Sequence, residues 1–532
     1  MHLGIKAVSL LARWLAAFCF FLAGASGVSA NEFRTPSITA ARVEWRAVLD
    51  QLRSEISSQP AIAPRFTFAG RHRMPASDPR ATPALVQLNA INSTIFAGIG
   101  RSPVPVLLPF DTAAYLDAQS GTPNPPVSRY QADFRPADFF HAGPSGYDAV
   151  FSLDPGAGAS LPSRVFARPV EVQITGSLLT YDLADPLGGR GVPVRALAAQ
   201  FPGMRRFIRE GYVRYAFTRF GVPYVVSIQC LDSAPRPRRL ACREAYPIAE
   251  RFLKALRVAG GQPARPRRDI ASDLAERPVP RSPDFSYRPS GDIIANSSAR
   301  NRGGRVDLIA YSQIRFPLAK APVLVSSQQF GKRKSGVYQG IYPWRDNFCE
   351  ARSFQVGQCA AGFGHQGQDI RPAPCPPNSD GEAACHPRKQ AVVAVRDGIL
   401  IRSPKQQAAT LQINTGNEHI RFRYMHMNPS TMDADGILSG RRVAEGEKIG
   451  VVSNYLDFPN GTSYHLHFDV QVFTRDGWIW VNPYTTLITS YERLIRGRGR
   501  EIGTDPPGAA VAHVLPEDVL RHSVRQGDRR VN

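Results

Sequence analysis

The sequence predicts a multidomain protein, with a C-terminal all-β domain of antiparallel strands preceded by a small α+β domain and Pro-rich segments. A chain of 532 residues is longer than one compact domain normally is. Hydrophobic residues make up 43% of it, enough for a core, and its 45 prolines indicate long connections. After the first thirty residues, no apolar stretch approaches the ~20 residues needed to cross a bilayer.

The first segment, residues 1–30, has the order of a secretory signal peptide. Lys6 and Arg13 precede an apolar run, and Val28-Ser29-Ala30 ends it with small residues. We expect cleavage after Ala30 and a periplasmic or secreted protein; the alternative is an uncleaved membrane anchor.

The segments that follow differ in composition. Residues 31–143 are rich in Pro, Ala and Arg, with one helical stretch around residues 40–52. In residues 144–261, strands are expected at 170–174 and 178–183, joined by a Thr175-Gly176 turn, and at 212–218 and 222–230. Residues 194–200 have a helical composition, and an amphipathic helix is expected at 248–258. The remaining segments are a linker at 262–305, a β-rich domain at 306–490 and a basic tail at 491–532.

Six cysteines remain outside the signal peptide, an even number that indicates disulfides in an exported chain. Cys230 and Cys242 lie in the α+β segment, and a bridge between them would close its Arg/Pro-rich loop. The other four, Cys349, Cys359, Cys375 and Cys385, are expected to form two bridges. A zinc ribbon would need paired C-x2-C spacing, which is absent from the sequence.

The formal net charge of +21 favours an anionic partner. In an exported protein this means an anionic envelope polymer or membrane surface rather than nucleic acid. The alternative is that the charge serves solubility alone.

The first motif with metal-binding chemistry is Gly364-His365-Gln366-Gly367-Gln368-Asp369. An imidazole and a carboxylate are both good zinc ligands. Gly364 and Gly367 suit a tight loop that turns both side chains inward. The H-x3-D spacing alone is common by chance.

The second motif is an H-x-H strand around His465 and His467. Period-2 alternation places these two side chains with Asp469 and Gln471 on one face and an apolar set on the other. Such a strand can present one histidine to a metal and its neighbour to a substrate.

The third motif ends a predicted strand at His426. Alternation places this residue with Ile420, Phe422 and Tyr424 on the inward face, at the rim of a cavity. Alone, His426 is more often a rim histidine with its hydrogen bonds satisfied.

Together and in this order, the motifs resemble the LytM/lysostaphin-type zinc metalloendopeptidases, which have the duplicated hybrid motif fold. The resemblance covers roughly residues 316–488. The blocks that carry it are Ser326–Arg333, His365 with Asp369, Val392–Ala394 leading into Asp397-Gly398, Tyr424 with His426, Val443 with Gly446 and Ile449-Gly450, His465–Phe468, and Val481–Pro483.

The resemblance implies that His365, Asp369 and His467 hold Zn²⁺ and that His426 and His465 are an unliganded catalytic pair. Three protein ligands leave a fourth position for water, as a catalytic zinc requires. Because no H-E-x-x-H helix exists in the sequence, a histidine must serve as the base. The substrate class it implies is the peptide crosslinks of peptidoglycan.

Two alternatives stay open: a non-enzymatic LytM-like activator of other cell-wall hydrolases, and a zinc protease acting on protein substrates. The sequence departs from the family pattern in the Pro/Cys-rich loop that holds His386, a less favoured metal ligand, and in the long segment 453–463. We expect that segment or the N-terminal region partly to cover the groove. His419 is expected to be a solvated hairpin residue.

Overall fold

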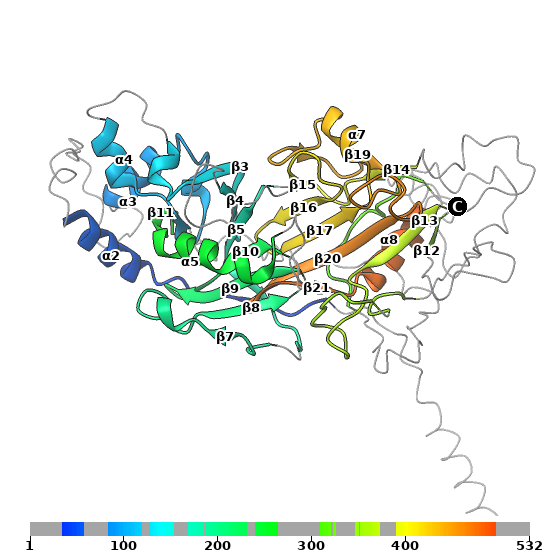
Figure 1. The fold of residues 1–532 in the computed structure, drawn as a ribbon, viewed down its shortest axis with the longest axis horizontal. Helices are drawn as coiled ribbons and strands as arrows, with labels where there is room; N and C mark the ends of the chain where they lie inside the picture. The colour runs from blue at the N-terminus through cyan, green and yellow to red at the C-terminus, as the bar shows by residue number, and fades with distance from the viewer. Residues whose placement is uncertain are drawn as a thin grey trace, which may run out of the picture.

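The computed structural model describes residues 35–57, 83–119, 127–153, 169–185, 188–209, 211–230, 240–263, 309–320, 323–325, 346–350, 352–372 and 390–495. Two large antiparallel sheets lie side by side within this part of the chain (Figure 1). They confirm the predicted multidomain β-rich fold. In the described residues no helix is long and apolar enough to cross a membrane. The expected signal peptide lies outside them, as do most of the linker and of the tail.

The first sheet has the strand order β3-β4-β5-β10-β9-β8-β7, with antiparallel pairing throughout. Its strands are β3 (Phe134–Gly143), β4 (Gly146–Leu153), β5 (Glu171–Ser177), β7 (Val192–Pro193), β8 (Arg205–Arg209), β9 (Tyr212–Arg219) and β10 (Val222–Gln229). The boundary expected at residue 144 therefore falls between two paired strands, β3 and β4. We call the part of the chain around this sheet, residues 35–263, the N-terminal unit.

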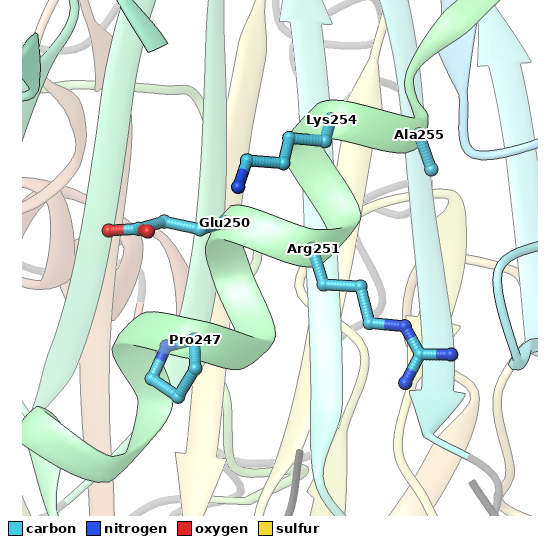
Figure 2. Close-up of a pocket in the computed structure, with 5 residues that line it drawn as sticks. All are labelled: Pro247, Glu250, Arg251, Lys254 and Ala255. Carbon is cyan, nitrogen blue, oxygen red and sulfur yellow. The ribbon is translucent and has the colours of Figure 1, made fainter. Parts of the chain in front are cut away.

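Helix α5 (Ala245–Ala255) packs against this sheet through residues at helical spacing. Ala245, Ile248, Ala249, Phe252 and Leu253 are its buried positions, so an amphipathic helix is present. The bounds expected for it, 248–258, are wrong, because the helix ends at Ala255 and residues 257–258 begin strand β11 (Arg257–Gly260). A Cys230–Cys242 disulfide ties the residue after β10 to the short helix before α5, which confirms the expected bridge. A hollow on this helix is lined by Pro247, Glu250, Arg251, Lys254 and Ala255 (Figure 2). These five side chains include no histidine and one carboxylate, so they do not form a metal site.

Smaller elements complete the N-terminal unit. Helix α2 packs Trp45, Val48, Leu49 and Leu52 into the same core as α5. The elements are β1 (Ile38–Ala40), α2 (Trp45–Ser57), α3 (Pro83–Asn92), β2 (Val106–Leu108), α4 (Thr112–Gln119), β6 (Leu179–Tyr181) and β11 (Arg257–Gly260). Strand β1 pairs with β6, and β2 pairs with β11.

The hairpin predicted at Thr175-Gly176 is wrong. Strand β5 runs straight through both residues to Ser177, and the next strand, β6, pairs with β1 instead. The reason is close packing: a Cβ at Gly176 would lie 2.6 Å from the Tyr224 ring and 2.8 Å from the Tyr147 ring. The glycine is therefore needed because two buried tyrosine rings lie against it, and it does not form a turn. The helix predicted at 194–200 is only a 3-10 turn, Arg195–Leu197.

The second sheet has the order β12-β13-β20-β17-β16-β15-β18, with β21 paired to β20. Its strands are β12 (Val323–Val325), β13 (Gln368–Pro372), β15 (Gly398–Ile401), β16 (Ala409–Asn414), β17 (His419–Met425), β18 (Arg442–Val443), β20 (Leu466–Thr474) and β21 (Gly477–Val481). Beside them lie the pair β14 (Ala391–Val393) and β19 (Lys448–Val451) and the helices α7 (Pro429–Ala434) and α8 (Tyr484–Ile495). Helix α8 crosses the boundary expected at residue 490.

One face of this sheet is core, as the alternation predicts. Leu466, Phe468, Val470 and Val472 of β20 join Ile420, Phe422 and Tyr424 of β17 in a single apolar cluster. The opposite face, which we call the polar face, carries His467, Asp469 and Gln471 of β20 and, across the strand pairing, Arg421 and Arg423 of β17.

The N-terminal unit packs against the far end of this polar face. Asp148 of β4 accepts hydrogen bonds from His419 Nε2 at 2.8 Å and from Arg421 at 2.9 Å. Thr175 of β5 donates to the same carboxylate and accepts from the Trp478 indole N–H of β21 at 3.1 Å. A buried network of charged and polar groups therefore fastens the two sheets together.

The prediction that His419 is a solvated hairpin residue is wrong. Its side chain is fully buried, and its Nδ1 lies 2.7 Å from Ser177 Oγ while Nε2 binds Asp148. The turn before it is exposed, so the local sequence is that of a hairpin tip. The neighbouring sheet, distant in sequence, covers His419.

Candidate metal centre

Three side chains from different strands and loops converge at the other end of the polar face. His365 Nε2 lies 3.1 Å from His467 Nδ1 and 3.2 Å from Asp369 Oδ1, and the latter two atoms are 3.1 Å apart. Each of the three side chains is buried. Lone pairs of two nitrogens and one oxygen thus face one another in a buried place, an arrangement that a cation would stabilise.

The spacing fits zinc. A tetrahedral ion with bonds of 2.0–2.1 Å separates its ligand atoms by about 3.3 Å. The three observed distances of 3.1, 3.1 and 3.2 Å form one nearly equilateral face of such a tetrahedron. Imidazole and carboxylate donors also match the ligand chemistry of a catalytic zinc site, which leaves its fourth position open.

Backbone pairing positions two of these residues. Asp369 on β13 lies directly opposite His467 on β20 in the antiparallel register, so the two side chains share a face. A ligating carboxylate must be ionised, and a cation at this place would stabilise the charged form of Asp369.

A disulfide-closed loop positions the third residue, His365. The Cys349–Cys359 bridge closes the loop, and Cys349 N donates to His365 O while His365 N donates to Glu350 O, both at 2.8 Å. The ring Nδ1 lies 3.0 Å from the carbonyl oxygen of Asn347. This bridge confirms half of the disulfide set expected for the β-rich domain; Cys375, Cys385 and His386 lie outside the described residues.

The two remaining predicted site residues lie beside these three side chains. The His426 ring is centred 4.5 Å from the His465 ring and 6.1 Å from the His467 ring. His465 Nε2 lies 3.4 Å from Asp369 Oδ1. Both are buried, and neither belongs to the converging set of three.

His426 reaches this face through its backbone conformation. Strand alternation would place it on the core face with Tyr424, away from His465. Strand β17 ends at Met425, and His426 has a left-handed backbone with φ 68°. This turn directs the ring toward His465. The sequence correctly predicts that His426 lies at the end of a strand. The alternation of side chains cannot predict its left-handed backbone, and therefore gives the wrong face for its ring.

The segment 453–463 borders the two histidines. His426 Nδ1 lies 3.0 Å from Tyr455 O, and His465 Nδ1 lies 2.6 Å from Ser463 O. Leu456 and Phe458 of this segment are exposed, at 38% and 61%. The pKa of His426 is lowered to about 3, first by burial and then by repulsion from His465 and His467. Its ring is therefore neutral at physiological pH.

Sequence reasoning missed several supporting groups. For Asp469 the alternation predicts the correct face, that of His467, but the pattern assigns no supporting role to this residue. Asn347 and Tyr455 act through backbone carbonyls, which every residue possesses, so side-chain chemistry could not identify them.

The two glycines of the first motif allow close approach rather than an unusual backbone angle. A Cβ on Gly364 would lie 2.7 Å from Cys349 Cα. A Cβ on Gly367 would lie 2.4 Å from Phe468 O and 2.8 Å from His467 Nε2. Both glycines are therefore sterically required next to the converging ligands.

We expect Gly367→Ala to weaken zinc binding by at least about tenfold, because the added methyl group displaces the His467 ring. Competition with a chromophoric chelator measures the affinity. Gly416→Ala is the matched control, since a Cβ there meets nothing within 4 Å. Equal zinc affinity in the two variants would contradict this account of Gly367.

Comparison with known proteins gives one structural neighbour. No family model matches the chain, and no curated protein matches it. A solved structure of a candidate glycyl-glycine endopeptidase LytM from Ruminococcus gnavus ATCC 29149 aligns at 19% identity with a TM-score of 0.18. The alignment covers 25% of this chain and 51% of that chain, about half of its length.

Proposed function

We propose that this protein is an exported zinc metalloendopeptidase that hydrolyses peptide crosslinks of peptidoglycan. The observation that carries the proposal is the convergence of His365 Nε2, Asp369 Oδ1 and His467 Nδ1 at the ligand spacing of tetrahedral zinc. The order of the sequence motifs supports the substrate class, and the net charge of +21 suits an anionic envelope polymer. A periplasmic or secreted location follows from the expected signal peptide.

Zinc at this site would supply Lewis acidity toward a peptide carbonyl and toward water. The chain's own groups supply the proton transfers. The Nδ1 atoms of His426 and His465 face carbonyl oxygens, which only accept hydrogen bonds, so each Nδ1 carries the proton and Nε2 has the lone pair. Either Nε2 can take a proton from the attacking water and return it to the leaving amine.

The pKa of His426, lowered to about 3, keeps that ring neutral at physiological pH. All five predicted positions are filled by residues with the required chemistry. This favours an enzyme over the alternative of a non-enzymatic activator, which needs neither ligands nor a base.

Digestion of purified sacculi tests the proposal. The zinc-loaded full chain should release crosslink peptides, chelator treatment should stop the release, and added zinc should restore it. The substrate spectrum separates the alternatives. Release only in the presence of a second wall hydrolase would indicate an activator, and cleavage of unfolded protein but not of sacculi would indicate a general protease.

A further inference from the structure

All but one of the histidines of the centre place Nδ1 against a backbone carbonyl oxygen. His365, His426 and His465 each direct Nδ1 to a backbone carbonyl oxygen, those of Asn347, Tyr455 and Ser463. A carbonyl only accepts, so these rings carry their proton on Nδ1 and have the lone pair on Nε2. His467 is reversed: its Nδ1 faces His365 and Asp369, so its lone pair must be on Nδ1.

For His467 the opposite nitrogen faces a side chain. Its Nε2 has no hydrogen-bond partner among the described residues, and Asp469 Oδ2 lies 3.4 Å from it. No backbone carbonyl takes this role, because His467 sits within central strand β20, between β13 and β17. A carboxylate oxygen at 3.4 Å is near enough to accept this N–H after a small approach, and that bond would select the tautomer with its lone pair on Nδ1.

Asp469 is itself held rigidly. Its side chain is fully buried, Oδ2 accepts from Arg423 Nε at 2.7 Å, and Oδ1 accepts from the Trp480 indole N–H at 3.1 Å. Arg423 lies directly opposite Asp469 on β17, and Trp480 comes from β21 on the other side. Donors from both neighbouring strands therefore fix the carboxylate beside the ring.

We infer that Asp469 is a positioning residue that fixes the ring orientation and tautomer of His467, so that Nδ1 is presented to the metal. The inference rests on the proposed zinc site and extends it to a residue that touches neither metal nor substrate. A carboxylate in this relation to a ligating histidine also increases the basicity of the ligand nitrogen, and its loss typically weakens metal binding by about 10–100-fold.

The test is zinc affinity of the full chain, measured by chelator competition, for Asp469→Asn against Asp148→Asn. Asp148 is also a buried carboxylate bound to a histidine and an arginine on the same face, but it belongs to the contact between the sheets. Asp469→Asn should bind zinc about 10–100-fold more weakly, whereas Asp148→Asn should keep wild-type affinity. Equal affinity of Asp469→Asn and wild type would overturn the inference, as would equal losses in both variants.

A second measurement needs no Asp469 variant, and therefore does not depend on that variant folding. In zinc-loaded wild-type protein labelled with ¹⁵N, the His467 ring signals are assigned from the backbone resonances of that residue. They should report a metal-bound Nδ1 and a protonated Nε2. Coordination through Nε2 would overturn the inference and leave the proposed function intact. A wild-type chain that binds no zinc would overturn the proposed function and this inference with it.

Discussion

His467→Ala protein should purify without zinc and without hydrolytic activity. The substitution leaves His365 and Asp369 as the only ligands of the converging set, and two ligands do not retain a catalytic zinc. Metal content is measured by elemental analysis of the purified protein alongside sacculus digestion. The change also removes a buried ring, so a melting curve of the variant must show that the chain is still folded.

His465→Ala and His426→Ala are the matched variants, because they remove buried imidazoles from the same centre without removing a ligand. Both should keep zinc and lose roughly a hundredfold to ten-thousandfold in rate, the usual contribution of one proton-transfer group. If His465→Ala loses zinc while His467→Ala keeps it, the two roles are reversed. If neither His465→Ala nor His467→Ala lowers the zinc content, the metal site lies elsewhere.

The part of the centre that the sequence predicts best depends on strand alternation. In β20 each residue's face follows from its parity, so His467 and Asp469 fall on one side, and His465, the residue just before the strand, shares that parity. The register of β13 against β20 then brings Asp369 opposite His467. Local pattern decides the positions along β20, whereas the position of Asp369 depends on a strand pairing between segments far apart in sequence, and the sequence singles it out only by the H-x3-D spacing.

Other features depend on contacts between segments far apart in sequence. His419 is part of a hairpin with polar turn residues, and its burial comes from Asp148 and Ser177 of the N-terminal sheet together with Phe473 and Trp478 of its own sheet. Gly176 resembles a turn residue until the rings of Tyr147 and Tyr224 are placed against it. The left-handed backbone of His426 likewise follows from how β17 ends in three dimensions. Tertiary packing overrides the local signal at each of these positions.

Removing the carboxylate that joins the two sheets should strongly reduce the stability of the protein. Asp148→Ala should lower the free energy of unfolding by about 3–5 kcal/mol, because it leaves the buried Arg421 and His419 without their carboxylate. Chemical denaturation monitored by tryptophan fluorescence measures the change, since Trp478 borders the network through Thr175. Asp50→Ala is the control: its 2.8 Å ion pair with Arg53 is as short as that of Asp148 but largely exposed, so its loss should cost less than about 1 kcal/mol.

The pH dependence of this difference gives a second check. Burial acts to raise the pKa of Asp148, but His419, Arg421 and Thr175 outweigh it and lower the pKa from 3.8 to about 2. A depressed pKa in the folded state means that the ionised form stabilises the protein. The contribution is therefore complete above about pH 4 and is lost as the pH falls toward 2. The stability gap between wild type and Asp148→Ala should narrow as the pH falls below about 4. A gap that instead widened below about pH 4 would mean that Asp148 is protonated in the folded protein and is not an ionised partner of Arg421.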